Sequence, residues 1–177
     1  SNENELRYII EANILPDNSY AKWNVYYEAI ANANLVIEYA HLVAEHDPDF
    51  TEGDLQVVLG EMYAMRALCH FYLVRTFGDV PIVHDNAGMI ESGTYNEQYK
   101  VHKADVYDYI VMTLEKAIEL LPVQCTEGRL DKYCAKGLLA KVYLTKAGVT
   151  GSLNADDLQK AAEYAKDVVV NSGRELE

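Results

Sequence analysis

Aromatic side chains are the residues of this chain whose chemistry is easiest to foresee. The sequence contains 14 tyrosines among 177 residues, and aromatic rings can stack on the apolar faces of sugar rings. Tyr95 and Tyr99 fall in a long polar connection, so they are the candidates for contact with a ligand. Other aromatic residues recur at helical spacing, which predicts that they lie in the core. These include Trp23, Tyr27, Tyr63, Tyr143 and Tyr164.

Acidic residues and histidines form no pattern that predicts catalysis or metal binding. Residues 47–53 (DPDFTEG) resemble the opening of a calcium loop, but the glycine comes one position late and Val58 stands where a glutamate is needed. His41 and His46 are five residues apart, so they face different directions on a helix. Nothing selects a glycosidase pair from the 28 acidic residues. We therefore expect no catalytic residue, no metal ligand, no cofactor and no enzymatic activity.

The net charge of the chain excludes two classes of partner. The formal net charge is −13 and the isoelectric point is about 4.7, which argues against nucleic acid because phosphates require a basic surface. It also argues against docking on an anionic membrane surface.

Cys69 lies in an apolar helical stretch and is expected in the core. The sequence leaves open whether Cys125 and Cys134, which flank a turn, pair with each other.

The hydrophobic periodicity is helical almost throughout, and we expect an all-α fold of antiparallel helices. A first helix is predicted over 3–13, ended by Pro16, and a second over 20–45. Thr51 with Asp54 reads as a capping box for a helix that runs to Phe77 and closes at Gly78 in the left-handed conformation. Residues 79–102 form a long connection. Further helices are predicted over 103–121, from the Asp131 cap to Lys146, and from the Asn154 cap to Asn171.

The chain is predicted to be a single helical domain over 1–177, a piece of a longer protein, with repeat-like helix pairs at 51–122 and 130–173. The spacing of small and bulky residues resembles the tetratricopeptide pattern, in which helical hairpins stack in a right-handed arrangement. In the first pair the matching residues are Ile110, Leu114, Ala117 and Pro122. In the second pair they are Leu139, Ala140, Tyr143, Ala161, Ala165 and Val168.

Four blocks of the sequence carry a resemblance to a known family. Residues 60–83 read GEMYAMRALCHFYLVRTFGDVPIV, a helix that stops at a glycine and leaves in an extended Val-Pro-Ile-Val segment. Ahead of it stands the aromatic-rich block WNVYYEAI at 23–30, followed by Ala33 and Asn34. Residues 106–122 and 132–144 supply two further helical blocks. In this order the blocks resemble the RagB/SusD family of SusD-like outer-membrane nutrient-uptake lipoproteins.

This resemblance implies a function that the other sequence features do not. It implies that the chain is the N-terminal, tetratricopeptide-like helical portion of a carbohydrate-binding protein, and that this protein captures glycans for polysaccharide utilisation. The implied partners are a SusC-like, TonB-dependent outer-membrane transporter and, for the full-length protein, an oligosaccharide. The implied location is the surface of the outer membrane, with a lipid anchor in the full-length protein. The alternative is a tetratricopeptide-type protein-interaction scaffold that binds no sugar.

Asn34 and Arg66 are polar residues for which burial in a helical core is expected. Asn34 falls on or beside the apolar stripe of its helix, where an amide must bond to a neighbouring loop or carbonyl because an unpartnered polar group would be costly. Arg66 is expected to be partly buried against a carboxylate such as Glu61 or Glu38, in a structural ion pair.

Overall fold

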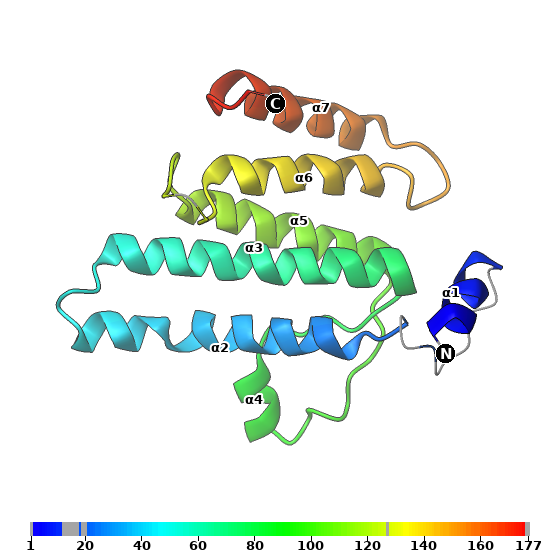
Figure 1. The fold of residues 1–177 in the computed structure, drawn as a ribbon. Helices are drawn as coiled ribbons and strands as arrows, with labels where there is room; N and C mark the ends of the chain where they lie inside the picture. Colours follow the sequence, from blue (N-terminus) through cyan, green and yellow to red (C-terminus); the bar gives the residue numbers. More distant parts are fainter. Residues whose placement is uncertain (1, 12–17, 19–20, 127, 176–177) are drawn as a thin grey trace.

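The computed structural model describes residues 2–11, 18, 21–126 and 128–175. Five long helices lie side by side in a row, each antiparallel to the one before it along the chain (Figure 1). They are α2 (Asn24–His46), α3 (Glu52–Phe77), α5 (Lys103–Leu120), α6 (Lys132–Lys146) and α7 (Ala155–Asn171). The expected all-α fold of stacked antiparallel hairpins is therefore confirmed. The division into repeat pairs at 51–122 and 130–173 stays a prediction.

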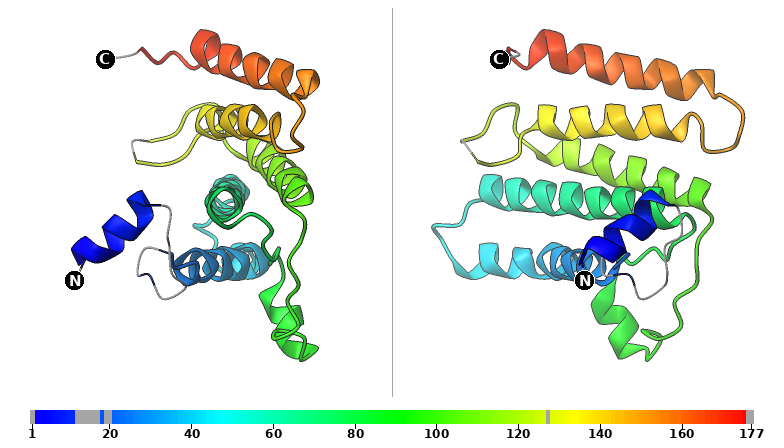
Figure 2. Two further views of the ribbon diagram at one scale, coloured as in Figure 1. Left: turned by 90° about the vertical axis from the view of Figure 1, so that its right-hand side faces the viewer. Right: turned by 45° about the vertical axis from the view of Figure 1, so that its right-hand side comes forward.

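Two shorter helices lie outside the row. Helix α1 (Asn2–Ile10) lies near the N-terminal end of α2, and α4 (Asn86–Glu91) projects from the connection between α3 and α5 (Figure 2). Pro16, which was expected to end the first helix, lies outside the described residues. Within the described part of the chain no strand forms, and the extended pairing is an isolated antiparallel bridge between Val80 and Val101.

Side-chain caps that the sequence predicted set the starts of three long helices. Thr51 and Asp54 form the full capping box, with the Asp54 amide donating to Thr51 Oγ1 (3.2 Å) and the Thr51 amide to Asp54 Oδ2 (2.9 Å). Asp131 caps α6 by accepting from the Tyr133 and Cys134 amides, each at 3.0 Å. Asn154 caps α7 in the same manner. Each cap satisfies amides that the first helical turn leaves without a partner, so these three starts were predicted correctly.

Three local expectations were wrong. Helix α2 begins at Asn24, later than the predicted start near residue 20, and no side chain caps it. Gly78 has φ +75° but ψ −123°, so it leaves α3 in an extended conformation open to glycine rather than in a left-handed turn. The connection 79–102 contains α4, which the sequence conceals because it is six residues long with a glycine at its centre.

The core lies along both sides of α3. Its fully buried side chains come from every long helix except α7, and include Ile30, Leu73, Ile110, Leu114 and Leu139. Small residues of α3 allow close approach, since Ala64 and Ala67 are buried and Ala64 packs with Ala117 and Ala135 of the neighbouring helices. Cys69 is buried in this core as predicted. Of the tyrosines expected there, Tyr143 is buried, and the others pack against the core while partly exposed.

Helix α3 is the central element of the row. Of the helices that the structure describes, it alone is long and apolar enough by composition to cross a membrane, and half of its most apolar stretch is buried. Because α2 and α5 flank it, we interpret it as the core helix of the bundle. Its closest approach is at Gly60, where an added Cβ would lie 2.8 Å from Leu121 Cγ and 3.2 Å from the Leu121 backbone nitrogen.

Substitution of Gly60 tests this close approach. Gly60→Ala and Gly137→Ala both gain helix propensity of about 1 kcal/mol, but Gly137 of α6 faces open space. We expect Gly60→Ala to be the less stable variant by about 1 to 3 kcal/mol, the cost of overpacking a filled core. Urea unfolding of the two variants measures the difference. Equal stabilities would show that Leu121 moves aside at no cost and that the approach is not tight.

Candidate ligand-binding site

A pocket of about 600 Å³ lies between the N-terminal half of α2 and the connection that follows α3. We call it the connection pocket. Helix α2 and the residue before it contribute Trp23, Asn24, Tyr27, Glu28 and Ala31, and the connection contributes Pro81, Val83, Asn86, Met89, Tyr95 and Gln98. Its volume is in the range of pockets that take small ligands. Most of its lining is apolar or aromatic, with a few amides and one carboxylate.

Side chains of α2 hold the connection in place. The Tyr27 hydroxyl donates to the Pro81 carbonyl at 2.9 Å, and burial raises the pKa of Tyr27 to about 12. Asn34 is buried, and its Nδ2 donates to the Val83 carbonyl (3.2 Å) and to Asn86 Oδ1 (2.6 Å). The prediction that Asn34 bonds to a neighbouring loop is confirmed. These bonds satisfy backbone carbonyls that have no strand partner, so the wall of the pocket depends on them.

The far side of the pocket is built by α4 and the turn after it. Asp85 caps α4 by accepting from the Gly88 amide (2.8 Å). After α4 the chain reverses, with the Thr94 amide donating to the Met89 carbonyl at 2.9 Å. Gln98 Nε2 reaches back to Met89 Sδ (3.3 Å) and the Thr94 carbonyl (3.4 Å). The residues around Tyr95 are therefore tied to α4.

Two aromatic rings from different elements line the connection pocket. Trp23 is 45% exposed and Tyr95 is 53% exposed. The expectation that Trp23 lies in the core was wrong, because it is at the cap position before α2 rather than within the helix. One part of the indole packs on Tyr27 and Phe77, with ring centroids at 6.1 and 5.9 Å. The exposed remainder is a surface on which an apolar ligand face can stack.

The structure separates the two tyrosines that the sequence offered as ligand contacts. Tyr95 lines the connection pocket, whereas Tyr99 is 78% exposed and is not part of its lining. The polar lining residues Asn24, Glu28, Asn86 and Gln98 were not foreseen. For Asn24 and Glu28 a signal existed, because positions 23, 24, 27, 28 and 31 share one face of a helix. Asn86 and Gln98 carry no such signal, since the path of the connection alone brings them there.

Behind the pocket wall lies a buried polar cluster. Arg66 Nη1 of α3 donates to Asn34 Oδ1 at 2.9 Å, and the Arg66 guanidinium lies 5.0 Å from the Tyr63 ring and 5.7 Å from the Tyr109 ring. Within the described residues it makes no ion pair with a carboxylate, so the expected pairing with Glu61 or Glu38 was wrong. Glu61 is on another face of α3, where the Arg129 guanidinium donates to both of its carboxylate oxygens, each at 2.7 Å.

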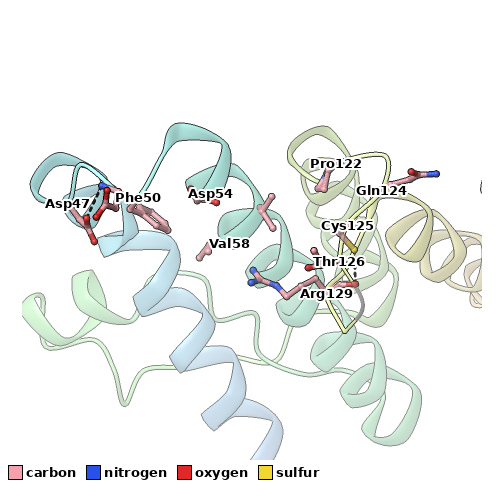
Figure 3. Close-up of a pocket in the computed structure, with 11 residues that line it drawn as sticks. Asp47, Phe50, Asp54, Val58, Pro122, Gln124, Cys125, Thr126 and Arg129 are labelled. Carbon is pink, nitrogen blue, oxygen red and sulfur yellow. Dashed lines mark hydrogen bonds between the residues drawn. The ribbon is translucent and has the colours of Figure 1, made fainter.

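A second groove, of about 810 Å³, lies between the turn from α2 to α3 and the loop 121–131 (Figure 3). Two of its charged groups, Asp54 and Arg129, are occupied by local structure. Asp54 belongs to the capping box, and the hydrogen bonds from Thr51 hold its pKa below the usual value. Arg129 is bound to Glu61. Burial alone would raise the pKa of Glu61, but the hydrogen bonds from Arg129 and the Leu130 amide outweigh it, so that the pKa is lowered. These groups have little left to offer a ligand.

Cysteines and metal-ligating side chains do not define a further site among the described residues. Cys69, Cys125 and Cys134 are all free thiols, and Cys125 Sγ donates to the Arg129 carbonyl at 3.0 Å. Among these residues no group of three or more His, Cys, Asp or Glu side chains is placed to hold a metal ion. The connection pocket is therefore the better candidate site, because its aromatic surfaces are exposed and several of its polar groups face a cavity.

Comparison with known proteins identifies the family. Residues 2–144 match the SusD-like family model described as "Starch-binding associating with outer membrane". The chain is 31% identical over 164 residues to a SusD-like protein of Bacteroides ovatus, covering 92% of this chain and 29% of that protein. The chain belongs to the SusD-like family, a carbohydrate-binding family associated with the outer membrane, and the resemblance drawn from its sequence is confirmed.

Two solved structures share the fold. A crystal structure described as containing a xylogluco-oligosaccharide superposes with a TM-score of 0.73 at 31% identity, over 88% of this chain and 30% of that one. A laminarin-binding SusD-like protein superposes with a TM-score of 0.71 at 27% identity, over 88% of this chain and 32% of that one. The chain thus spans about a third or less of the length of these relatives.

His70, which lies one turn after Arg66 on α3 and is fully buried, makes the free energy of unfolding depend on pH. Burial lowers the pKa of His70 from 6.5 to about 4; its hydrogen bond to the Arg66 carbonyl opposes this, and the Arg66 charge adds to it. As the pH falls below 6.5, the unfolded chain takes up a proton at His70 that the folded chain binds only near pH 4. We therefore expect the free energy of unfolding to fall by about 3 kcal/mol over this window through His70.

Urea unfolding from pH 7 to pH 4 measures this contribution. His70→Phe removes the titrating group, so its stability should decline less steeply than that of the unmodified protein over that range. Carboxylates titrate identically in both proteins and cancel in the comparison. Parallel curves would mean that His70 takes up its proton as readily in the folded chain as in the unfolded one.

Proposed function

We propose that this chain is part of a non-catalytic glycan-capture protein and that the connection pocket contributes to its oligosaccharide site. The observation that carries the proposal is the convergence of Trp23 and Tyr95, two half-exposed rings from different elements, on one pocket that also contains amide groups. Rings supply surfaces for the apolar faces of a sugar, and amides donate to or accept from its hydroxyls. This is the combination that a carbohydrate requires.

The lining favours a neutral glycan. None of the described residues lining the connection pocket is Lys, Arg or His, and its one charged side chain is Glu28. A uronic acid or a sulfated sugar would bring negative charge next to that carboxylate without a cation to balance it, in a chain of net charge −13. The ligands that appear in the descriptions of two structural relatives, a xylogluco-oligosaccharide and laminarin, support a glucan.

The same lining supports capture rather than hydrolysis. Glycosidases require two carboxyl groups across the scissile bond, whereas Glu28 is the one carboxylate lining the connection pocket. Binding without turnover suits a protein that passes its ligand on. In keeping with the family, we propose that the full-length protein is lipid-anchored at the surface of the outer membrane and acts with a SusC-like, TonB-dependent transporter in nutrient uptake.

Aromatic substitutions test the site. In the full-length gene product, Trp23→Ala and Tyr95→Ala should each weaken binding of a xylogluco-oligosaccharide or a laminarin oligosaccharide by about tenfold, because each removes a stacking surface. Isothermal titration calorimetry gives the affinities, and circular dichroism verifies that the helices are intact. Tyr99→Ala is the matched control, since it removes the same side chain from the same connection outside the pocket, and its affinity should stay unchanged.

Two results would contradict the proposal. If Trp23→Ala and Tyr95→Ala bind as tightly as the unmodified protein, the connection pocket is not the glycan site. If the unmodified protein binds neither these glucans nor any member of a broad panel of neutral glycans, glycan capture itself is wrong, and a scaffold that binds protein becomes the better interpretation.

A further inference from the structure

A chain of hydrogen bonds leads from the centre of α3 to the wall of the connection pocket. Arg66 Nη1 donates to Asn34 Oδ1 at 2.9 Å. Asn34 Nδ2 then donates to Asn86 Oδ1 at 2.6 Å and to the Val83 carbonyl at 3.2 Å. Asn86 and Val83 both line the connection pocket, whereas Arg66 and Asn34 do not. Four residues from α3, α2 and the connection thus form one continuous path.

Arg66 is an unusual residue for its position. It is only 7% exposed, and its charge is balanced by no carboxylate among the described residues. Instead it contacts the Asn34 amide and the faces of Tyr63 and Tyr109, and its Nε has no hydrogen-bond partner. An apolar side chain of similar length would avoid the cost of burying this charge. What the guanidinium supplies, and an apolar residue cannot, is a fixed donor for Asn34.

The direction of the hydrogen bonds is determined from both ends. A guanidinium can only donate, so the oxygen of Asn34 must face Arg66. A carbonyl can only accept, so the Nδ2 of Asn34 must face Val83. The amide of Asn34 therefore has one allowed orientation, and Asn86 must turn its own oxygen toward it. The group of Asn86 that is left for a ligand is its Nδ2 amide, a donor.

We propose that Arg66 and Asn34 are positioning residues that make Asn86 a hydrogen-bond donor toward the bound glycan and fix the pocket wall at Val83. This inference rests on the proposed function of the connection pocket. It specifies the ligand further, because the atom that Asn86 contacts must be an acceptor, such as a hydroxyl or ring oxygen of a sugar. Neither positioning residue touches the ligand.

Asn34→Asp is the sharpest test, because it keeps the shape of the side chain and reverses the direction of the hydrogen bond between residue 34 and Asn86. The new carboxylate still accepts from Arg66, so the variant should remain folded. It cannot donate, so the Val83 carbonyl loses its hydrogen bond, and Asn86 must turn its Nδ2 toward the carboxylate and present its oxygen to the ligand instead. We expect affinity for the glucan that the unmodified full-length protein binds to fall about tenfold, the effect of replacing a donor by an acceptor.

A double-substitution cycle separates positioning from general damage. In an Asn86→Ala background the orientation of residue 86 no longer matters. Asn34→Asp should therefore weaken glycan binding by less than about fivefold in that background, compared with about tenfold on its own. Arg66→Met should follow the same pattern if it remains folded. His70→Phe is the control: it alters the same buried cluster one turn along α3 without touching Asn34, and it should leave affinity unchanged.

The outcomes distinguish this inference from the proposed function. If Trp23→Ala weakens binding but a folded Asn34→Asp variant binds normally, the positioning role is wrong and the pocket assignment stands. Equal losses from Asn34→Asp with and without Asn86 would overturn the assignment of Asn86 as the oriented donor, because the effect would then not pass through Asn86. If Trp23→Ala and Tyr95→Ala have no effect, the proposed function fails first.

Discussion

The packing of α3 between α2 and α5 is the constraint on which the rest of the molecule depends. A helix buried on two sides must present small residues where its neighbours approach, and α3 does so at Gly60, Ala64 and Ala67. With α3 fixed, the row of helices follows, since α6 packs on α5 and α7 packs on α6. The exit of α3 at Gly78 then directs the following connection back toward α2, which places one wall of the connection pocket.

That connection could not hold its place through regular secondary structure. Apart from α4 and the single bridge at Val80, its backbone has no ladder of hydrogen bonds. Side chains of α2 hold the connection instead. The Tyr27 hydroxyl donates a hydrogen bond to the Pro81 carbonyl, and the Asn34 amide donates to the Val83 carbonyl and to Asn86 Oδ1. A polar group that crosses an apolar core is costly unless all of its partners are met. The need to satisfy Asn34 explains why Arg66 lies in the core without a carboxylate.

The arrangement combines a rigid scaffold with an adaptable surface. The groups that we assign to ligand contact, Trp23 and Tyr95, are half-exposed and belong to segments next to helices rather than to helix interiors. The groups that hold those segments are buried. Such a division suits a family whose members share this helical framework, because side chains at the rim can change without disturbing the packing behind them.

The sequence by itself determined the five long helices, the caps of three of them and the family, because these depend on local spacing and on residues close together in the chain. The side-chain caps and the helical stripes are of this kind. Only the tertiary structure decided which residues meet in the connection pocket. Tyr95 and Tyr99 look alike in the sequence, and Asn86 and Gln98 do not stand out at all. Their positions depend on the path of a connection held by partners 49 to 54 residues away along the chain, and no local pattern records such contacts.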